Sequence, residues 1–215
     1  YDEVDASITP AGPFCIIDAE TTLTAADPGG EWSGSGIVNQ STGLFSPSMA
    51  GVGDHTIQYS IQNGACSDTE TTIIHVDSYP SVSVTGAGPL CENETPINLN
   101  ASPAGGLWSG TGITDPNNGV FDPSASSFGS FTITYTVTNG ACTASANTTI
   151  QVDENIVPII NPAGPWCENN NPVTLTASHS GGTWSGTGIT NASTGTFNPQ
   201  ISGCGDFIIS YQLNN

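Results

Sequence analysis

The chain of 215 residues carries 19 aspartates and glutamates but neither lysine nor arginine, so its formal net charge is −19 at pH 7. Without cationic side chains it cannot neutralise phosphate groups, which excludes nucleic-acid binding. No stretch approaches about 18 consecutive apolar residues, and the opening YDEV is not a basic, apolar leader. We therefore expect no membrane insertion and no signal peptide, as in a mature fragment of a longer protein.

One motif recurs with a period of 76 residues. Gly-Gly-x-Trp-Ser-Gly-x-Gly-Ile surrounds Trp32, Trp108 and Trp184, and a tyrosine follows each tryptophan by 27 residues. Such a period is typical of a tandem array of one module. It divides the chain into module 1 (residues 1–77), module 2 (78–153) and an incomplete module 3 (154–215), whose last strand is missing.

Taken in order, the modules are separated by short junctions that contain Val-Asp, at Val4-Asp5, Val76-Asp77 and Val152-Asp153. The junctions hold proline and β-branched residues rather than Gly-Ser runs, so neighbouring modules should meet at restricted angles. The sequence therefore predicts an elongated rod.

After each junction, apolar and polar residues alternate as they do in half-buried strands. Such a strand is expected over 21–25, 96–102 and 172–178, and the tryptophan motif supplies the next one. The clearest alternation is FTITYTVTN (131–139), which FIISYQLNN (207–215) repeats. Asn63-Gly64 and Asn139-Gly140 then predict hairpins that lead into return strands.

No segment has a helical period, and about seven short strands are expected in each module. The fold class is therefore all-β, with tandem Ig-like antiparallel β-sandwich modules. Large aromatic side chains flanked by glycine on a central strand should fill the core, whereas exposed tryptophans could instead stack on sugars. The predicted core residues are Trp32, Trp108, Trp184, Tyr59, Tyr135 and Tyr211.

The cysteines also recur. Cys15 and Cys66 are 51 residues apart, as are Cys91 and Cys142. This spacing predicts one disulfide within each module and an oxidising, extracellular setting, with free buried thiols as the alternative. In module 3, Cys167 pairs either with Cys204 or with a partner beyond the fragment. Trp166 is expected to cover the disulfide.

The combination of GGxWSGTGI, a Gly-x-Phe-x-Pro turn, a Thr-Ile-x-Tyr strand and NGAC resembles repeats of giant secreted surface proteins of Bacteroidetes, including gliding-motility adhesins. The resemblance covers essentially the whole chain. It implies Ig-like or PKD-like repeats, export by the type IX route and display on the cell surface. The tyrosine lies seven residues before the second cysteine rather than two, so the disulfide should not cross the core as it does in immunoglobulin domains.

No pattern supports catalysis. His55, His75 and His179 occupy unrelated positions in their modules, and no nucleophile or metal ligand recurs with them, so we expect no enzyme and no required cofactor. Calcium is possible at the junctions, with Asp77, Asp153 and Glu154 as ligands, although solvated linker acids are the alternative. A melting curve unchanged by calcium or by chelator would contradict a calcium site. The loop from Asp115 to Asp122 is expected to be a turn.

The sequence thus predicts non-enzymatic stalk repeats of an extracellular bacterial surface adhesin, which provide extension and mechanical stability. The expected partners are neighbouring repeats of the same protein. Two alternatives stay open: modules that bind carbohydrate or another surface, and a self-assembling filament completed by strand donation.

Overall fold

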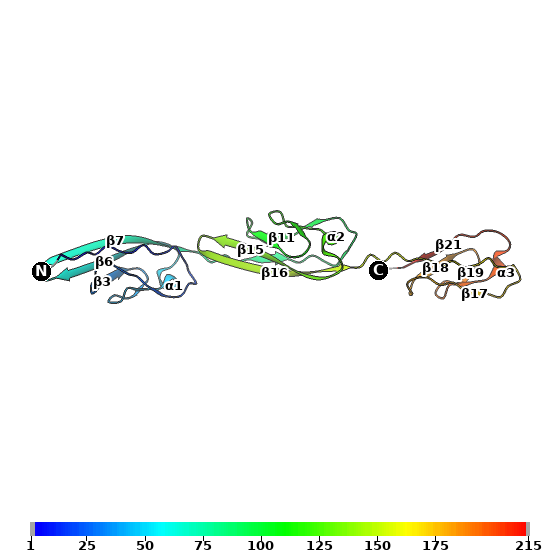
Figure 1. Cartoon of the computed structure of the whole chain (residues 1–215), viewed down its shortest axis with the longest axis horizontal. Helices are drawn as coiled ribbons and strands as arrows, with labels where there is room; N and C mark the ends of the chain where they lie inside the picture. Colours follow the sequence, from blue (N-terminus) through cyan, green and yellow to red (C-terminus); the bar gives the residue numbers. More distant parts are fainter. Residues whose placement is uncertain (1–2, 214–215) are drawn as a thin grey trace. The chain divides into compact units, whose positions relative to one another are not determined.

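The computed structural model describes residues 3–213. The chain forms two compact units, of which the first ends at Glu154 and the second begins at Asn155 (Figure 1). The first unit contains two hydrophobic cores, one in module 1 and one in module 2, and the second unit contains a third core. Each module therefore buries its own apolar side chains.

Module 1 consists of two facing sheets. One sheet has the strand order β1-β7-β6-β3 and the other has the order β2-β5-β4. All neighbouring strands are antiparallel except β1, which runs parallel to the end of β7. The elements are β1 (Phe14–Cys15), β2 (Thr21–Thr22), β3 (Glu31–Gly34), β4 (Ile37–Asn39), β5 (Leu44–Phe45), α1 (Pro47–Ala50), β6 (Gly53–Asn63) and β7 (Cys66–Asp77).

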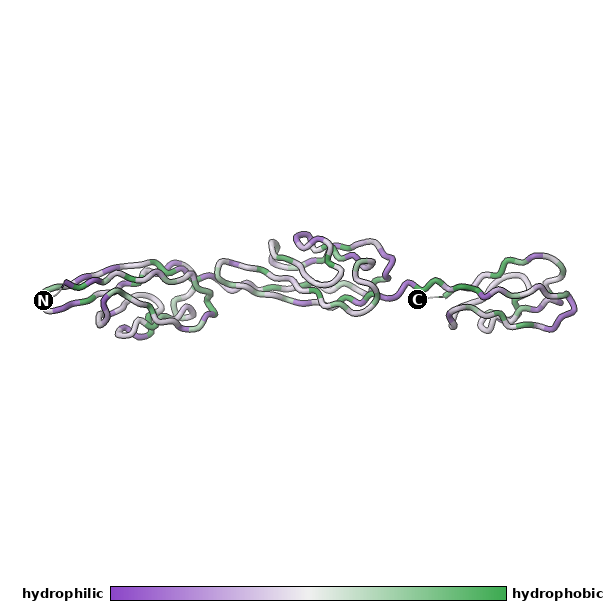
Figure 2. The backbone as a smooth tube through the Cα atoms, viewed as in Figure 1, coloured by the Kyte–Doolittle hydropathy of each residue, from purple (hydrophilic) through white to green (hydrophobic). Residues whose placement is uncertain are grey.

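Module 2 repeats this arrangement, with sheets β12-β15-β16-β9 and β10-β14-β13 and a short additional ladder between β8 and β11. Apolar positions are interspersed with polar ones along the long hairpin β15–β16 (Figure 2). The elements are β8 (Ser83–Thr85), β9 (Leu90–Cys91), β10 (Ile97–Asn98), β11 (Asn100–Ser102), β12 (Leu107–Ser109), β13 (Ile113–Asp115), β14 (Val120–Phe121), α2 (Pro123–Ser126), β15 (Gly129–Asn139) and β16 (Cys142–Asp153).

Module 3 has a sheet β17-β20-β19 and a two-stranded sheet β18-β21. The strand expected over 207–215 is shorter in the structure, where β21 covers Ile209–Gln212, and positions 214–215 lie outside the described residues. The other elements are β17 (Val173–Thr174), β18 (Thr183–Gly186), β19 (Ile189–Asn191), β20 (Thr196–Phe197) and α3 (Pro199–Ser202). The three single-turn helices, each beginning at a proline, are elements that the hydrophobic periodicity did not predict.

The recurring tryptophan and tyrosine form the centre of each core. Trp32 lies opposite Tyr59 on neighbouring strands, with ring centroids 4.6 Å apart. The Tyr59 hydroxyl donates to the Asp27 carbonyl at 2.6 Å and accepts from the Gly30 amide at 2.7 Å. A buried phenol needs such partners, because an unsatisfied polar group in a core is costly. Trp108 with Tyr135 and Trp184 with Tyr211 repeat this geometry.

The strand order identifies the fold class. In a constant-type immunoglobulin domain the second, fifth and fourth strands form one sheet, the third, sixth and seventh form the other, and a tryptophan on the third strand fills the core. Module 1 has this order, and Trp32 is on β3. The prediction of Ig-like β-sandwich repeats is therefore confirmed.

Candidate functional site

The disulfide of this protein joins two modules. Cys15 of module 1 is bonded to Cys142 of module 2, with their Cα atoms 4.8 Å apart and a sequence separation of 127. Both cysteines are buried. The predicted pairings of Cys15 with Cys66 and of Cys91 with Cys142 are therefore wrong. The interaction between neighbouring repeats that the sequence predicts is present here, and it is covalent.

The length of β7 explains why the pairing within a module fails. Cys66 begins β7, and Asp77 ends it. At about 3.3 Å per residue the two ends of this strand are roughly 36 Å apart. Cys15 lies beside Asp77 in the parallel pair between β1 and β7. The Cα atoms of Cys15 and Cys66 are therefore much farther apart than the roughly 7 Å that a disulfide can bridge.

Among residues 3–213, the remaining four cysteines are free: Cys66, Cys91, Cys167 and Cys204. The possible pairing of Cys167 with Cys204 is thus not formed. The Cys204 thiol instead lies 3.3 Å from a carboxylate oxygen of Glu168. The hydrogen bond to Glu168 raises the pKa of Cys204, because it stabilises the neutral thiol and the negative charge of Glu168 opposes ionisation.

The hairpin between β15 and β16 holds Cys142 against module 1. At its tip, the Ala141 amide donates to the Asp77 carboxylate at 2.8 Å. The side-chain amide of Asn139 donates to the Ser78 carbonyl at 2.9 Å and to its hydroxyl at 3.0 Å. These bonds tie the tip of module 2 to the end of β7, so the disulfide is part of a wider contact.

Gly140, between Asn139 and Ala141, is required by this contact. Its φ is +56°, in the left-handed region that favours glycine. A Cβ atom at this position would collide with the carboxylate of Asp77. The Asn-Gly pair that signals a hairpin in the sequence therefore also lets the hairpin approach Asp77 closely.

Asp77 also belongs to a short chain of polar side chains. Its carboxylate lies 3.3 Å from Nε2 of His75, whose Nδ1 contacts the carboxylate of Asp54. The hydrogen bond to Asp54, with smaller contributions from the charges of Asp54 and Asp77, raises the pKa of His75 above its usual 6.5. The imidazole of His75 thus lies between the carboxylates of Asp54 and Asp77 in a chain that has neither lysine nor arginine.

We expect the stability of the first unit to depend on pH through His75. Because folding raises the pKa of His75, the contribution is fully present below the unfolded value of about 6.5 and is lost as pH rises through the higher folded value. The melting temperature should therefore fall as the pH rises above about 6.5. His75→Gln should abolish that fall, and His179→Gln, in the second unit, should leave it intact. An unchanged pH profile in His75→Gln would contradict this assignment.

The predicted calcium ligands are not gathered into a cluster. Within residues 3–213, no group of three or more His, Cys, Asp or Glu side chains is arranged to hold a metal ion. Asp77 uses its carboxylate for Ala141 and His75, whereas Asp153 and Glu154 are exposed. Calcium at Asp77, Asp153 and Glu154 stays a prediction.

The other acidic candidates are turn residues, as expected. Asp115 accepts hydrogen bonds from Asn117 and from the backbone and side-chain amides of Asn118, which lower its pKa. Asp122 accepts from the Ser124 amide and caps α2. Both carboxylates therefore serve their own turns.

The remaining histidines have local partners. His55 contacts the Gly51 carbonyl at 2.8 Å and His179 contacts the Ser178 hydroxyl at 2.9 Å. Neither partner is a catalytic nucleophile or a metal ligand that recurs in the modules. Over the part of the chain that the structure describes, there is also no helix long and apolar enough to cross a membrane.

No protein-family model matches the sequence, and no curated protein matches it. Solved structures with a similar arrangement include the I67–I69 fragment of the titin I-band (TM-score 0.40, 14% identity, 84% of this chain and 77% of that one). Another is Drosophila N-cadherin EC1-4, with a TM-score of 0.35 and 14% identity over 89% of this chain and 64% of that one. A third is the insect immune protein hemolin, with a TM-score of 0.34 and 13% identity over 70% of this chain and 46% of that one. The chain thus spans only part of the length of N-cadherin EC1-4 and of hemolin. At these low TM-scores the similarity supports no functional inference.

Proposed function

We propose that this chain is a non-enzymatic stalk segment of an extracellular bacterial surface adhesin of the gliding-motility type. Its role is to hold a distal adhesive part away from the cell and to withstand pulling. The bacterial and adhesive parts of this proposal rest on the sequence motifs, whereas the stalk role rests on the junction between modules 1 and 2.

The observation that carries the stalk role is the disulfide between Cys15 and Cys142. A bond within a module would protect that module alone. A bond between modules also fixes how one repeat meets the next, and the hydrogen bond from the Ala141 amide at the hairpin tip to Asp77 acts in the same direction. A stalk requires this resistance to bending at each junction, and a free-standing binding module does not.

The disulfide also supports an extracellular location, because disulfides persist in oxidising environments. The absence of lysine and arginine removes every cleavage site for trypsin-type proteases, which suits exposure outside the cell. The high negative charge keeps such a chain soluble by self-repulsion.

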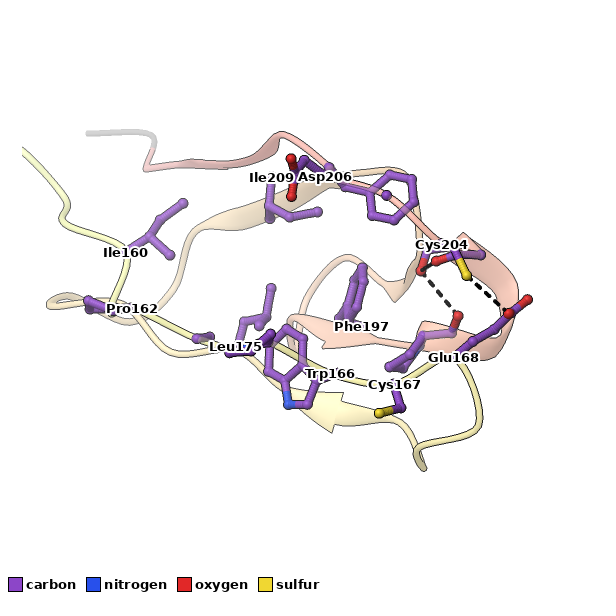
Figure 3. Close-up of a pocket in the computed structure, with 18 of the residues that line it drawn as sticks. Ile160, Pro162, Trp166, Cys167, Glu168, Leu175, Phe197, Cys204, Asp206 and Ile209 are labelled. Atoms are coloured by element: carbon purple, nitrogen blue, oxygen red, sulfur yellow. Dashed lines mark hydrogen bonds between the residues drawn. The ribbon is translucent and has the colours of Figure 1, made fainter.

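The carbohydrate-binding alternative has less support. Stacking on sugars requires an exposed aromatic face, but Trp32, Trp108 and Trp184 are all buried against tyrosines. Trp166 is the exception, because it is 37% exposed, and it lines a cavity of module 3 (Figure 3). Phe14 and Leu90 stand at the equivalent positions of modules 1 and 2, so this tryptophan is not part of a repeated surface.

Small-angle X-ray scattering of the whole chain tests the stalk. A single compact domain of this length would have a radius of gyration of about 17 Å. We expect roughly twice that value for a stalk. We expect the value to be the same in low and in physiological salt, because the covalent bond at the junction of modules 1 and 2 and the short, proline-containing junction before module 3 do not depend on charge repulsion. A radius near the compact value, or one that shrinks as salt is added, would contradict the proposal.

A further inference from the structure

The dipeptide Asn-Gly occurs three times, as Asn63-Gly64, Asn118-Gly119 and Asn139-Gly140. At such a pair the backbone nitrogen of glycine can attack the side-chain carbonyl carbon of asparagine, because glycine has no side chain to hinder the approach. The new N–C bond closes a succinimide ring, and the side-chain amide leaves as ammonia, which carries away the proton of the glycine amide. Water then opens the ring and leaves aspartate or isoaspartate. The rate of this deamidation depends on how freely the two reacting groups move.

The three asparagines are all exposed, but they differ in what holds their side chains. The side-chain amide of Asn118 donates to the Asp115 carboxylate at 2.7 Å, within a single turn. Asn63 lies at the tip of the β6–β7 hairpin, beside the free thiol of Cys66, and its side chain makes no hydrogen bond within residues 3–213. Asn139 lies at the corresponding tip of the β15–β16 hairpin, which is part of the junction between modules 1 and 2.

The junction opposes the reaction of Asn139 in two ways. The side-chain amide donates to the Ser78 carbonyl at 2.9 Å and to the Ser78 hydroxyl at 3.0 Å, so these bonds must break before the side chain can turn toward Gly140. The carboxylate of Asp77 lies against Gly140, where a Cβ atom would collide with it. Its negative charge opposes loss of the proton from the Gly140 amide, which the attack requires.

The disulfide keeps this arrangement closed. Cys142 is bonded to Cys15, and Cys15 lies beside Asp77 in the parallel pair between β1 and β7. While the bond is intact, the hairpin tip cannot move away from Asp77. After reduction only hydrogen bonds at the surface hold the tip, and such contacts open at a low cost in free energy.

We propose that Asn139 is a deamidation site protected by the disulfide between Cys15 and Cys142, and that reduction is followed by an irreversible release of the hairpin tip. The product carboxylate cannot donate to the Ser78 carbonyl, and it adds a negative charge near that of Asp77. Isoaspartate also lengthens the backbone by one methylene group, which disturbs the pairing of Asn139 with Cys142. A junction that has been reduced and deamidated therefore loses the ability to close again, a property beyond the stalk role.

The first test measures deamidation of the whole chain by mass spectrometry. A protease specific for aspartate and glutamate separates the three Asn-Gly pairs, because acidic residues lie between them. In the oxidised chain Asn139 should react at least about 10-fold more slowly than Asn63, since two hydrogen bonds must break first. After reduction, or in the double variant Cys15→Ser and Cys142→Ser, the rate at Asn139 should rise toward that of Asn63. Asn118 is the internal control, and its rate should not change.

The second test measures how well the reduced chain re-forms its disulfide. The variant Asn139→Asp reproduces the charge of the product, and we expect it to recover the bond between Cys15 and Cys142 more slowly than the parent chain. The matched control Asn63→Asp carries the same change at the tip of module 1 and should recover as the parent does.

Two results would show that the closed junction does not protect Asn139: equal rates at Asn139 and Asn63 in the oxidised chain, or a rate at Asn139 that reduction leaves unchanged. Recovery of the disulfide in Asn139→Asp at the rate of the parent chain would overturn the irreversible release.

Discussion

Reduction of the disulfide should lengthen the fully unfolded first unit by about 430 Å when the chain is stretched from its two ends. With the bond intact, the load passes from Cys15 directly to Cys142, so the 127-residue interval between them cannot extend. An extended chain spans about 3.4 Å per residue, which gives the expected gain. Single-molecule stretching with and without a thiol reductant measures it.

Two variants separate this result from a bond within one module. The pair Cys15→Ser and Cys142→Ser should show the long extension without reductant. Cys66→Ser should behave as the parent chain, because Cys66 is a free thiol. If Cys66→Ser lengthens the extension instead, the bond is within module 1 and the stalk mechanism proposed above is wrong.

The same bond should stabilise the unit in solution. In the chain-entropy model, closing a loop of this size reduces the entropy of the unfolded chain by an amount equivalent to about 5 kcal/mol. Because the loop includes most of both modules, breaking the bond also uncouples their unfolding. This coupling is a property that a bond within one module would not give.

Trp108→Ala should reduce the free energy of unfolding of the first unit by about 3–5 kcal/mol, the range for removal of a large buried aromatic side chain. Trp108 is buried against Tyr135, and Gly119 is so close to the indole that a Cβ atom there would collide with it. The site therefore cannot collapse easily around the cavity. Chemical denaturation followed by tyrosine fluorescence or circular dichroism measures the loss.

The matched control is Leu107→Ala on the same strand. Leu107 is 56% exposed and points to the opposite face, so its loss should change the free energy of unfolding by no more than about 0.5 kcal/mol. The comparison also addresses sugar stacking. If Trp108→Ala abolished binding to a polysaccharide while the free energy of unfolding stayed unchanged, the assignment of Trp108 to the core would be wrong.

Local signals in the sequence determined the module architecture. The alternation in residues 131–139 and the Asn139-Gly140 pair act within one strand or hairpin, and the structure has β15 and β16 where they predict them. The Trp108–Tyr135 core pair was predictable for the same reason, because the alternation places both side chains on the same face of neighbouring strands.

Only the tertiary structure decided the partner of Cys15. Modules 1 and 2 carry equivalent pairs of cysteines, so spacing alone cannot distinguish a partner in the same module from one in the next. The choice depends on the length of β7, which places Cys66 and Asp77 at opposite ends of the strand.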